Sequence, residues 1–250
     1  MSVLLQVQNV SKKFGGLTAL KDVTFDLPSG QILGLIGPNG AGKTTLFNTI
    51  NGVYKNDGGK VIFRGVDISD KKPYEVSKLG MSRTHQIVRP LNDLTVLENV
   101  QVGACFGHEN HSLAQSLSIA KDTLEFVRLD QKIDQLASSL NVAQKKRLEM
   151  ARALAAKPYL LLLDEVLAGL TPSEIDEMIK TILAIRDQGI TILMIEHVMK
   201  AVMNVSDRII VLDYGQQLAE GTPEEISENP EVIRAYLGDP KLAEKLMEDR

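Results

Sequence analysis

The segment that most constrains the fold of this chain is a glycine-rich loop between an apolar run and the start of a helix. The run QILGLIG ends at Gly37 and is short and apolar, which is typical of a buried strand. From Gly37 to Thr44 the sequence reads GPNGAGKT and matches the pattern G-x-x-x-x-G-K-[ST] at every fixed position. A helix is expected from Gly42 to about Asn51. Further apolar runs of this kind, YLLLLD, GITILMIE and RIIVLDYG, are separated by helical patterns, which points to a parallel α/β sheet.

The residue types in this loop suit the binding of a phosphate chain. Glycines let the backbone wrap closely around an anion, and the N–H groups at the start of the helix face that anion. Lys43 adds a cation for the outer phosphates, and the hydroxyl of Thr44 can ligate Mg²⁺. A glycine turn that matches the pattern by accident is the alternative, but the flanking strand and helix make such a coincidence rare.

A second signal lies where two adjacent carboxylates follow another apolar run. Open α/β sheets place their ligand-binding residues at the carboxyl ends of the strands, which is where Asp164 and Glu165 fall after LLLL. Asp164 can hold a Mg²⁺ shell, and Glu165 can polarise a water for in-line attack on a terminal phosphate. A pair of acidic residues that merely ends a strand is the alternative. Beside a phosphate-binding loop, the functional interpretation is favoured.

Two further residues are weaker candidates when judged by position alone. His197 follows the apolar run TILMIE, so its imidazole could reach a terminal phosphate from the end of a buried strand. A purely structural histidine is an equal alternative. Gln86 stands at the entry to a region of helical periodicity, where a solvated side chain is the ordinary interpretation of a glutamine.

Strand and helix patterns alternate along the rest of the chain, around a helical middle. Apolar residues take helical spacing between residues 90 and 157, and Thr171 with Glu174 forms a capping-box pattern. The last residues, 241–250, are expected to form a frayed, charged helix. Strands are expected at residues 3–10, 17–27, 31–37, 59–65, 159–164, 189–196 and 208–215.

Composition limits the classes of function. The chain has 250 residues and a formal net charge of −4, so nothing indicates binding to a nucleic-acid backbone. Cys105 is the one cysteine, which makes an internal disulfide impossible and a reducing cytosol the expected compartment. The sequence has no apolar run of about 18 residues and no secretory leader pattern, so neither a membrane span nor export is expected.

A phosphate-binding loop, an Asp-Glu strand and a strand-end histidine, in this order, resemble the ATP-binding-cassette (ABC) ATPases over about residues 3–238. The resemblance implies a single ABC ATPase domain over residues 1–250. Its implied fold is α/β, a P-loop NTPase with a mostly parallel core sheet, an N-terminal antiparallel β subdomain and an inserted helical subdomain. The implied parts are a nucleotide-binding core at 1–89 and 158–238, a helical subdomain at about 90–157 and a C-terminal tail at 239–250.

The resemblance also raises the weaker candidates. Gln86 matches the glutamine of the family's Q-loop, which is implied to contact Mg²⁺ and water, and His197 matches the switch histidine. Phe14 matches the aromatic residue that stacks on adenine, for which a π-face suffices. The implied catalytic residues are Glu165, His197 and Gln86, and the implied metal-binding residues are Thr44, Gln86 and Asp164. The implied ATP-binding residues are Phe14, Gly37, Pro38, Asn39, Gly40, Ala41, Gly42, Lys43, Thr44 and Thr45.

One motif departs from the family pattern. The signature Leu-Ser-Gly-Gly-Gln, which in the family binds the terminal phosphate of the opposite subunit's ATP, is replaced here by Leu140, Asn141, Val142, Ala143 and Gln144. Asn141 is a good helix N-cap, and backbone N–H groups at a helix start do not depend on the side chain. Val142 is β-branched where glycine is usual, which opposes close backbone approach. We interpret the segment as a working but altered signature; a site that hydrolyses ATP poorly is the alternative.

Three segments, RTHQIVRPLNDLTVLENV, DEVLAGLTP and VIRAYLGD, resemble the ATPases of branched-chain amino acid importers. This implies an ATPase on the cytoplasmic face of the membrane that pairs with a second copy or a paralogue, with permease subunits and indirectly with a solute-binding protein. The apolar stretch from Leu91 to Val102 is a candidate docking surface or, equally, subdomain core. One alternative is a nucleotide-binding subunit with weak or no turnover. The other is a soluble ABC ATPase acting on chromosomes or ribosomes, although the usual coiled coils and basic extensions are missing from the sequence.

Overall fold

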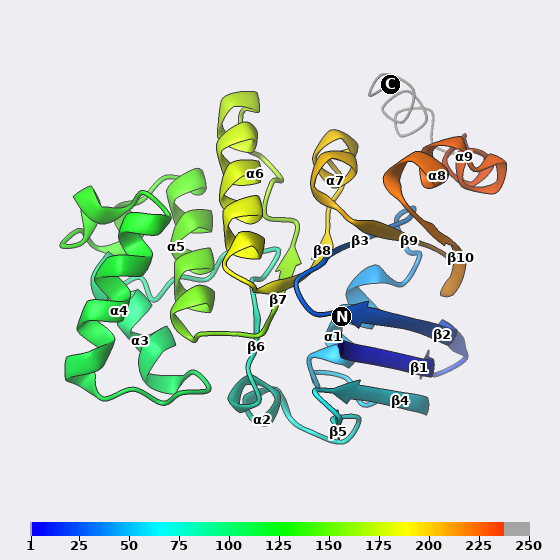
Figure 1. The fold of residues 1–250 in the computed structure, drawn as a ribbon, viewed down its shortest axis with the longest axis horizontal. Helices are drawn as coiled ribbons and strands as arrows, with labels where there is room; N and C mark the ends of the chain where they lie inside the picture. The colour runs from blue at the N-terminus through cyan, green and yellow to red at the C-terminus, as the bar shows by residue number, and fades with distance from the viewer. Residues whose placement is uncertain (1, 238–250) are drawn as a thin grey trace. The chain divides into compact units, whose positions relative to one another are not determined.

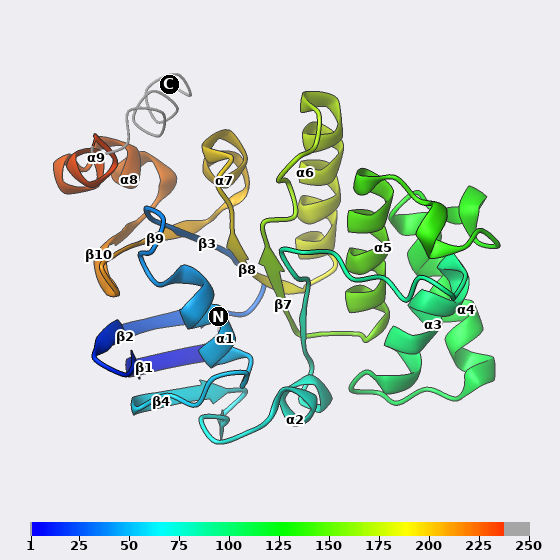
Figure 2. The same cartoon turned by 180° about the vertical axis from the view of Figure 1, so that it is seen from behind.

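The computed structural model describes residues 2–237, and the chain divides into two compact units. The first unit contains the residues up to Pro73 and those from Ile185 onward, and the second is Tyr74–Ala184. Figures 1 and 2 show the elements of each unit from opposite sides. The C-terminal tail and the helix expected at 241–250 lie outside the described residues. Within residues 2–237, no helix combines the length and apolar character that crossing a bilayer requires.

An antiparallel sheet of four strands, in the order β2-β1-β4-β5, lies in the first unit. Leu5 and Val7 of β1 are fully buried, whereas the residues between and beside them are less so, which is the alternation of a sheet with one covered face. β1 runs beyond residue 10, where the sequence pattern predicts its end, because its pairing with β2 continues to Phe14 and Leu17. The strands are β1 (Val3–Phe14), β2 (Leu17–Pro28), β4 (Gly58–Phe63) and β5 (Val66–Asp67).

The first unit also contains the strands β10, β9, β3 and β8, hydrogen-bonded in that order. β3 is parallel to both β8 and β9, and β10 is antiparallel to β9. Every residue of β3 and β8 is buried, in agreement with the continuous apolar runs that predicted these strands. The strands are β3 (Ile32–Ile36), β8 (Thr191–Ile195), β9 (Arg208–Asp213) and β10 (Gln216–Gly221).

Helices cover both faces of these four strands (Figure 1). α1 lies between them and the antiparallel sheet, and its buried residues include Leu46, Phe47 and Ile50. α7, α8 and α9 lie on the opposite face, where their apolar side chains pack with those of β3 and β9. The helices are α1 (Lys43–Ile50), α7 (Met199–Val205), α8 (Pro223–Glu228) and α9 (Pro230–Leu237), and the shared core is Ile36, Met199, Val202, Ile209, Val211, Ile226 and Val232.

The second unit contains a pair of parallel strands and most of the helices. β6 (Met81–Arg83) pairs in parallel with β7 (Leu160–Asp164). The sequence pattern does not predict β6, because three residues are too few to show a period. The chain between these strands forms α3 (Val96–Phe106), α4 (Leu113–Phe126), the 3₁₀ turns η1 (Asp130–Lys132) and η2 (Ala137–Ser139), and α5 (Val142–Ala155). α2 (Pro73–Lys78) precedes β6, and α6 (Pro172–Asp187) follows β7.

The apolar stretch from Leu91 to Val102 is partly core and partly surface. Val96 and Val100 of α3 are fully buried, in the unit where α3 packs on α4 and α5. Leu91, in the loop before α3, is exposed. The buried face of α3 is therefore part of the subdomain core. Only the exposed residues of the stretch remain candidates for a docking surface.

Capping boxes start the long helices of this unit, and the predicted one at Thr171 is present. The backbone N–H of Thr171 donates to Glu174 Oε2 at 2.8 Å, and the backbone N–H of Glu174 donates to Thr171 Oγ1 at 3.4 Å. The backbone hydrogen bond from Thr171, followed by its hydroxyl, lowers the pKa of the Glu174 carboxyl below its ordinary value. Because the folded-state pKa is depressed, this carboxylate contributes stability above its unfolded pKa and loses it as the pH falls through the lowered pKa.

Candidate functional site

The glycine-rich loop connects β3 to α1 with a backbone that only glycine can adopt at two positions. Gly37 has φ +150°, and a Cβ there would lie 2.1 Å from the carbonyl oxygen of Leu212. Gly42, the residue before α1, has φ +103°, and its Cβ would lie 2.7 Å from the carbonyl oxygen of Ala19. Left-handed backbone and lack of space together exclude side chains, which is the physical reason for the glycines in the pattern.

Lys43 lies inside this loop. It is the first residue of α1 and is only 6% exposed. Its Nζ donates to the carbonyl oxygens of Gly37 at 2.6 Å and Pro38 at 2.9 Å. All residues of α1 are described, and none in its first turn is acidic. The ammonium group, the positive end of the helix and the exposed residue Thr44 thus form a cradle suited to an anion such as a phosphate.

The first unit also contains the candidate aromatic residue and the candidate histidine. Phe14 ends β1 with 43% of its surface exposed. Its ring makes an edge-to-face contact with Tyr54, with 5.2 Å between centroids, and Lys12 Nζ lies 5.4 Å from the ring centroid. His197 is partly buried and comes two residues after the last residue of the fully buried β8.

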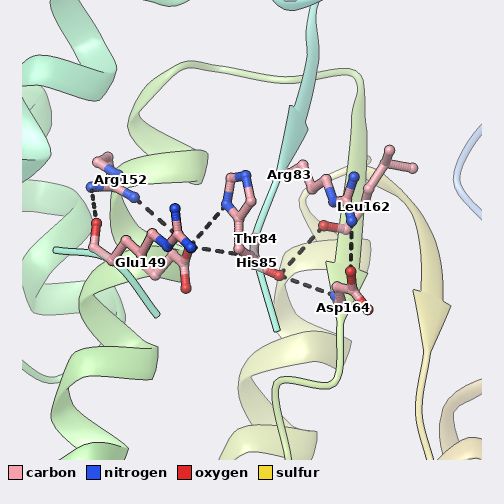
Figure 3. Close-up of polar contacts among 8 residues, drawn as sticks. Arg83, Thr84, His85, Glu149, Arg152, Leu162 and Asp164 are labelled. Carbon is pink, nitrogen blue, oxygen red and sulfur yellow. Dashed lines mark hydrogen bonds and ion pairs between the residues drawn. The ribbon is translucent and has the colours of Figure 1, made fainter. Parts of the chain in front are cut away.

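In the second unit, Asp164 ends β7 and is fixed by residues of and beside β6 (Figure 3). Arg83 Nη2 donates to Asp164 Oδ2 at 2.7 Å, and the backbone N–H of Asp164 donates to Thr84 Oγ1 at 3.2 Å. Asp164 is 2% exposed. Among the residues that the structure describes, no hydrogen-bond donor reaches its other carboxylate oxygen, Oδ1. A buried carboxylate oxygen of this kind fits a divalent cation with oxygen ligands, such as Mg²⁺.

Glu165 follows Asp164, and its carboxylate meets the amide of Gln86. Gln86 Nε2 donates to Glu165 Oε2 at 2.7 Å. The backbone of Glu165 has φ +51°, a left-handed conformation that is uncommon for residues other than glycine and is often found at functional sites. Gln86 is exposed, as the solvated interpretation expects, but its amide is engaged with a carboxylate. The structure therefore brings together two residues that the sequence places far apart.

The altered signature starts α5 with a complete capping box. The backbone N–H of Gln144 donates to Asn141 Oδ1 at 2.9 Å, and that of Asn141 donates to Gln144 Oε1 at 3.2 Å. The prediction of Asn141 as an N-cap is confirmed. Val142 is 59% exposed, whereas Ala143 is buried. The start of α5 is thus an ordered helix end with one β-branched side chain on its surface.

Replacing Asn141 by alanine is expected to destabilise the protein by about 1 kcal/mol, because it removes the side-chain acceptor for the Gln144 N–H. Chemical denaturation followed by circular dichroism measures the difference in the free energy of unfolding. Asn92→Ala is the matched control, since Asn92 is exposed in a loop and caps no helix. Equal unfolding free energies for the two variants would contradict a stabilising cap at Asn141.

Sequence reasoning missed the buried charged residues of the second unit. Arg83 pairs with Asp164, while Lys146 and Glu149 of α5 are 6% and 4% exposed. Arg147, between them, forms an ion pair with Glu177 of α6 that lowers the pKa of the Glu177 carboxyl. The sequence gives no clear signal for the two α5 residues, because they are two of five charged residues in that helix.

Comparison with known proteins adds sequence evidence to this geometry. A family model described as ABC transporter matches residues 20–168, and one described as branched-chain amino acid ATP-binding cassette transporter matches residues 216–241. The chain is 40% identical to the probable branched-chain amino acid transport ATP-binding protein LivG of Archaeoglobus fulgidus, over 94% of this chain and 95% of that protein. It is 38% identical to the high-affinity branched-chain amino acid transport ATP-binding protein BraF of Pseudomonas aeruginosa, over 94% and 98% of the two chains.

Solved structures are also similar to this chain. The ADP conformation of an ATP-binding cassette of an ABC transporter has a TM-score of 0.85 and 34% identity, over 96% of this chain and all of that one. The chain belongs to the ABC transporter family, and it is an ATPase cassette with the P-loop NTPase fold that binds adenine nucleotide. Within that family, its relatives over nearly the whole length are named as ATP-binding proteins of branched-chain amino acid transport.

Proposed function

We propose that this chain is the ATP-hydrolysing subunit of an importer for branched-chain amino acids. The observation that carries the hydrolytic part is the hydrogen bond of Gln86 to Glu165, directly after a carboxylate that suits a cation. A subunit that only binds nucleotide needs the glycine-rich loop but has no use for this pair. The solute class is supported by the names of the relatives and by the family match at residues 216–241.

Each candidate residue has a role in this proposal. Lys43 and the backbone N–H groups of the glycine-rich loop bind the phosphates of ATP, and Phe14 stacks on the adenine. Thr44, Asp164 and Gln86 would hold Mg²⁺, which would neutralise charge on the outer phosphates. The remaining loop residues, Pro38, Asn39, Ala41 and Thr45, complete the cradle.

Hydrolysis then follows from the carboxylate at the end of β7. Glu165 takes a proton from water while the water oxygen bonds to the terminal phosphorus, and the bond from phosphorus to the ADP oxygen breaks. Gln86, hydrogen-bonded to Glu165, orients the water, and His197 donates to an oxygen of the transferred phosphoryl group.

A second subunit completes the site in this proposal. Asn141, Val142, Ala143 and Gln144 contact the terminal phosphate of ATP bound to the opposite subunit, which is a copy or a paralogue of this chain. The capping box of Asn141 and Gln144 supports this role, because it orders a helix start whose backbone N–H groups suit a phosphate. Permease subunits hold the dimer on the cytoplasmic face of the membrane, and a solute-binding protein delivers the amino acid.

Transport by the assembled complex tests this proposal. The tagged chain is purified from detergent-solubilised membranes with its permease subunits and reconstituted into vesicles with the solute-binding protein. We expect uptake of radiolabelled leucine, isoleucine or valine that requires ATP on the side of the vesicle where this chain sits. Uptake of a different class of solute, with none of these three, would contradict the solute assignment while leaving the ATPase assignment intact.

One observation favours a second candidate function, a nucleotide-binding subunit with weak turnover. Val142 is exposed at the position where the family signature has glycine, and a β-branched side chain opposes close approach of this backbone to a phosphate. If this second candidate holds, the unaltered chain binds ATP, and in the assembled complex its kcat is far below that of the Val142→Gly variant. Equal kcat values for the two proteins would exclude this candidate.

Asp164→Asn is expected to raise the Mg²⁺ concentration for half-maximal ATP hydrolysis at least about tenfold, because it removes a negative charge from the proposed ligands. The Mg²⁺ dependence of nucleotide binding, followed by calorimetry, should shift in the same direction. Asp130→Asn, an exposed residue of η1, is the control and should leave both curves in place. An unchanged Mg²⁺ dependence in Asp164→Asn would remove this residue from the metal site.

A further inference from the structure

The helix that starts with the signature residues also contacts the backbone beside both members of the Gln86–Glu165 pair. α5 has two buried charged residues, Lys146 and Glu149, which lie one turn apart. Charged side chains are rarely buried unless their hydrogen bonds are made inside the protein. The hydrogen-bond partners of Lys146 and Glu149 therefore indicate the role of these two buried side chains.

Lys146 contacts the backbone of Glu165. Its Nζ donates to the carbonyl oxygen of Glu165 at 2.8 Å, and the backbone N–H of Ala168 donates to the same oxygen at 3.4 Å. A hydrogen bond from an ammonium group is stronger than one from a neutral amide. Glu165 has φ +51°, so its backbone needs support from its surroundings to keep this conformation. Lys146 supplies such support to the backbone from which the Glu165 side chain projects.

Glu149 contacts the backbone on the other side of the pair (Figure 3). Its Oε1 accepts the backbone N–H of His85 at 3.1 Å and lies 3.1 Å from His85 Nδ1. Arg152 Nη2, one turn further along α5, lies 3.8 Å from the same oxygen and balances its charge. His85 directly precedes Gln86, so this carboxylate fixes the backbone from which the Gln86 side chain projects.

We infer that Lys146 and Glu149 are positioning residues for hydrolysis, which couple the placement of α5 to the hydrogen bond between Gln86 and Glu165. One rigid helix holds a point beside each member of the pair, so a shift of the helix changes the geometry between the two side chains. A nucleotide of the opposite subunit that acts on the first turn of α5 then acts on the pair as well. This inference rests on the proposed catalytic roles of Gln86 and Glu165.

Variants that keep the shape of the side chain but remove its hydrogen bond test the inference. Lys146→Met deletes the donor, and Lys146→Arg restores a cationic donor. Glu149→Met deletes the acceptor, and Glu149→Gln restores an oxygen for the His85 N–H. Lys121→Met and Glu125→Met are controls from the exposed side of α4. All variants are studied in the full chain assembled with its partner subunits, and their melting temperatures identify any that fail to fold.

We expect Lys146→Met and Glu149→Met each to lower kcat for ATP about tenfold, with the Kd for ATP without Mg²⁺ unchanged within about twofold. The restoring variants should recover most of the lost kcat at equal or lower melting temperature. In a Glu165→Gln background, Lys146→Met and Glu149→Met should not lower the residual kcat further, because Lys146 and Glu149 act through Glu165 and Gln86.

The outcomes separate this inference from the proposed function. An unchanged kcat in both methionine variants would overturn the positioning role. So would a loss of kcat that parallels a lower melting temperature and is not recovered in Lys146→Arg or Glu149→Gln. If either methionine variant does not fold, the other carries the same comparison. Should Glu165→Gln abolish turnover while the methionine variants do not lower it, only the coupling through α5 fails. Should Glu165→Gln itself keep full turnover, the catalytic assignment fails first.

Discussion

Lys43→Ala is expected to lower the affinity of the chain for Mg-ATP by between about tenfold and a hundredfold. The reason is the loss of a charge-assisted contact to the outer phosphates, of about 1.5–3 kcal/mol. The loop itself also changes, since Lys43 Nζ donates to the carbonyl oxygens of Gly37 and Pro38. Isothermal titration calorimetry measures the Kd for Mg-ATP directly.

Lys21→Ala is the control for the loss of a positive charge in the same unit, because Lys21 is exposed on β2. Its Kd should equal that of the unaltered chain. Thermal unfolding of both variants shows whether the lost affinity reflects a lost fold. An unchanged Kd in a folded Lys43→Ala variant would refute the assignment of the glycine-rich loop as the triphosphate site, on which every other assignment depends.

Glu165→Gln is expected to lower kcat by about 10²–10⁴-fold while Mg-ATP still binds. Glutamine cannot take a proton from the attacking water, yet its amide oxygen can still accept the hydrogen bond that Gln86 Nε2 donates to Glu165 Oε2. The geometry of the pair is therefore retained and the chemistry is removed, which separates binding from turnover. Steady-state hydrolysis and calorimetric binding measure the two effects independently.

The matched control is Glu125→Gln, which neutralises an exposed carboxylate of α4 in the same unit. It should hydrolyse ATP at the unaltered rate. Indistinguishable kcat values for Glu165→Gln and Glu125→Gln would remove Glu165 from the mechanism. A loss of Mg-ATP binding in Glu165→Gln would instead indicate a structural effect at the end of β7.

Local patterns predicted much of the fold. The fully buried strands β3 and β8 and the cap at Asn141 follow from properties of neighbouring residues, and the structure confirms them. β6 was missed because it is too short to show periodicity, and it is a strand through its pairing with β7. The short strand matters for the site, because it brings Arg83 to Asp164.

Contacts between distant segments lay beyond the reach of sequence patterns. The bond from Gln86 to Glu165 joins residues 79 positions apart, and the bond from the His85 N–H to Glu149 joins residues 64 apart. No local propensity specifies which glutamine or which buried glutamate meets which backbone group, because that choice depends on how β6, α5 and β7 pack.

The sequence by itself determined the glycine-rich loop, since Gly37 and Gly42 take backbone conformations closed to other residues and Lys43 follows on the first turn of a helix. These constraints act over a few neighbouring residues, so the amino-acid sequence alone shows them. Only the tertiary structure decided that Lys146 and Glu149 of one helix contact the backbone beside Glu165 and Gln86. The physical reason is that a buried charge finds its partners wherever packing brings them, and packing is a property of the whole unit.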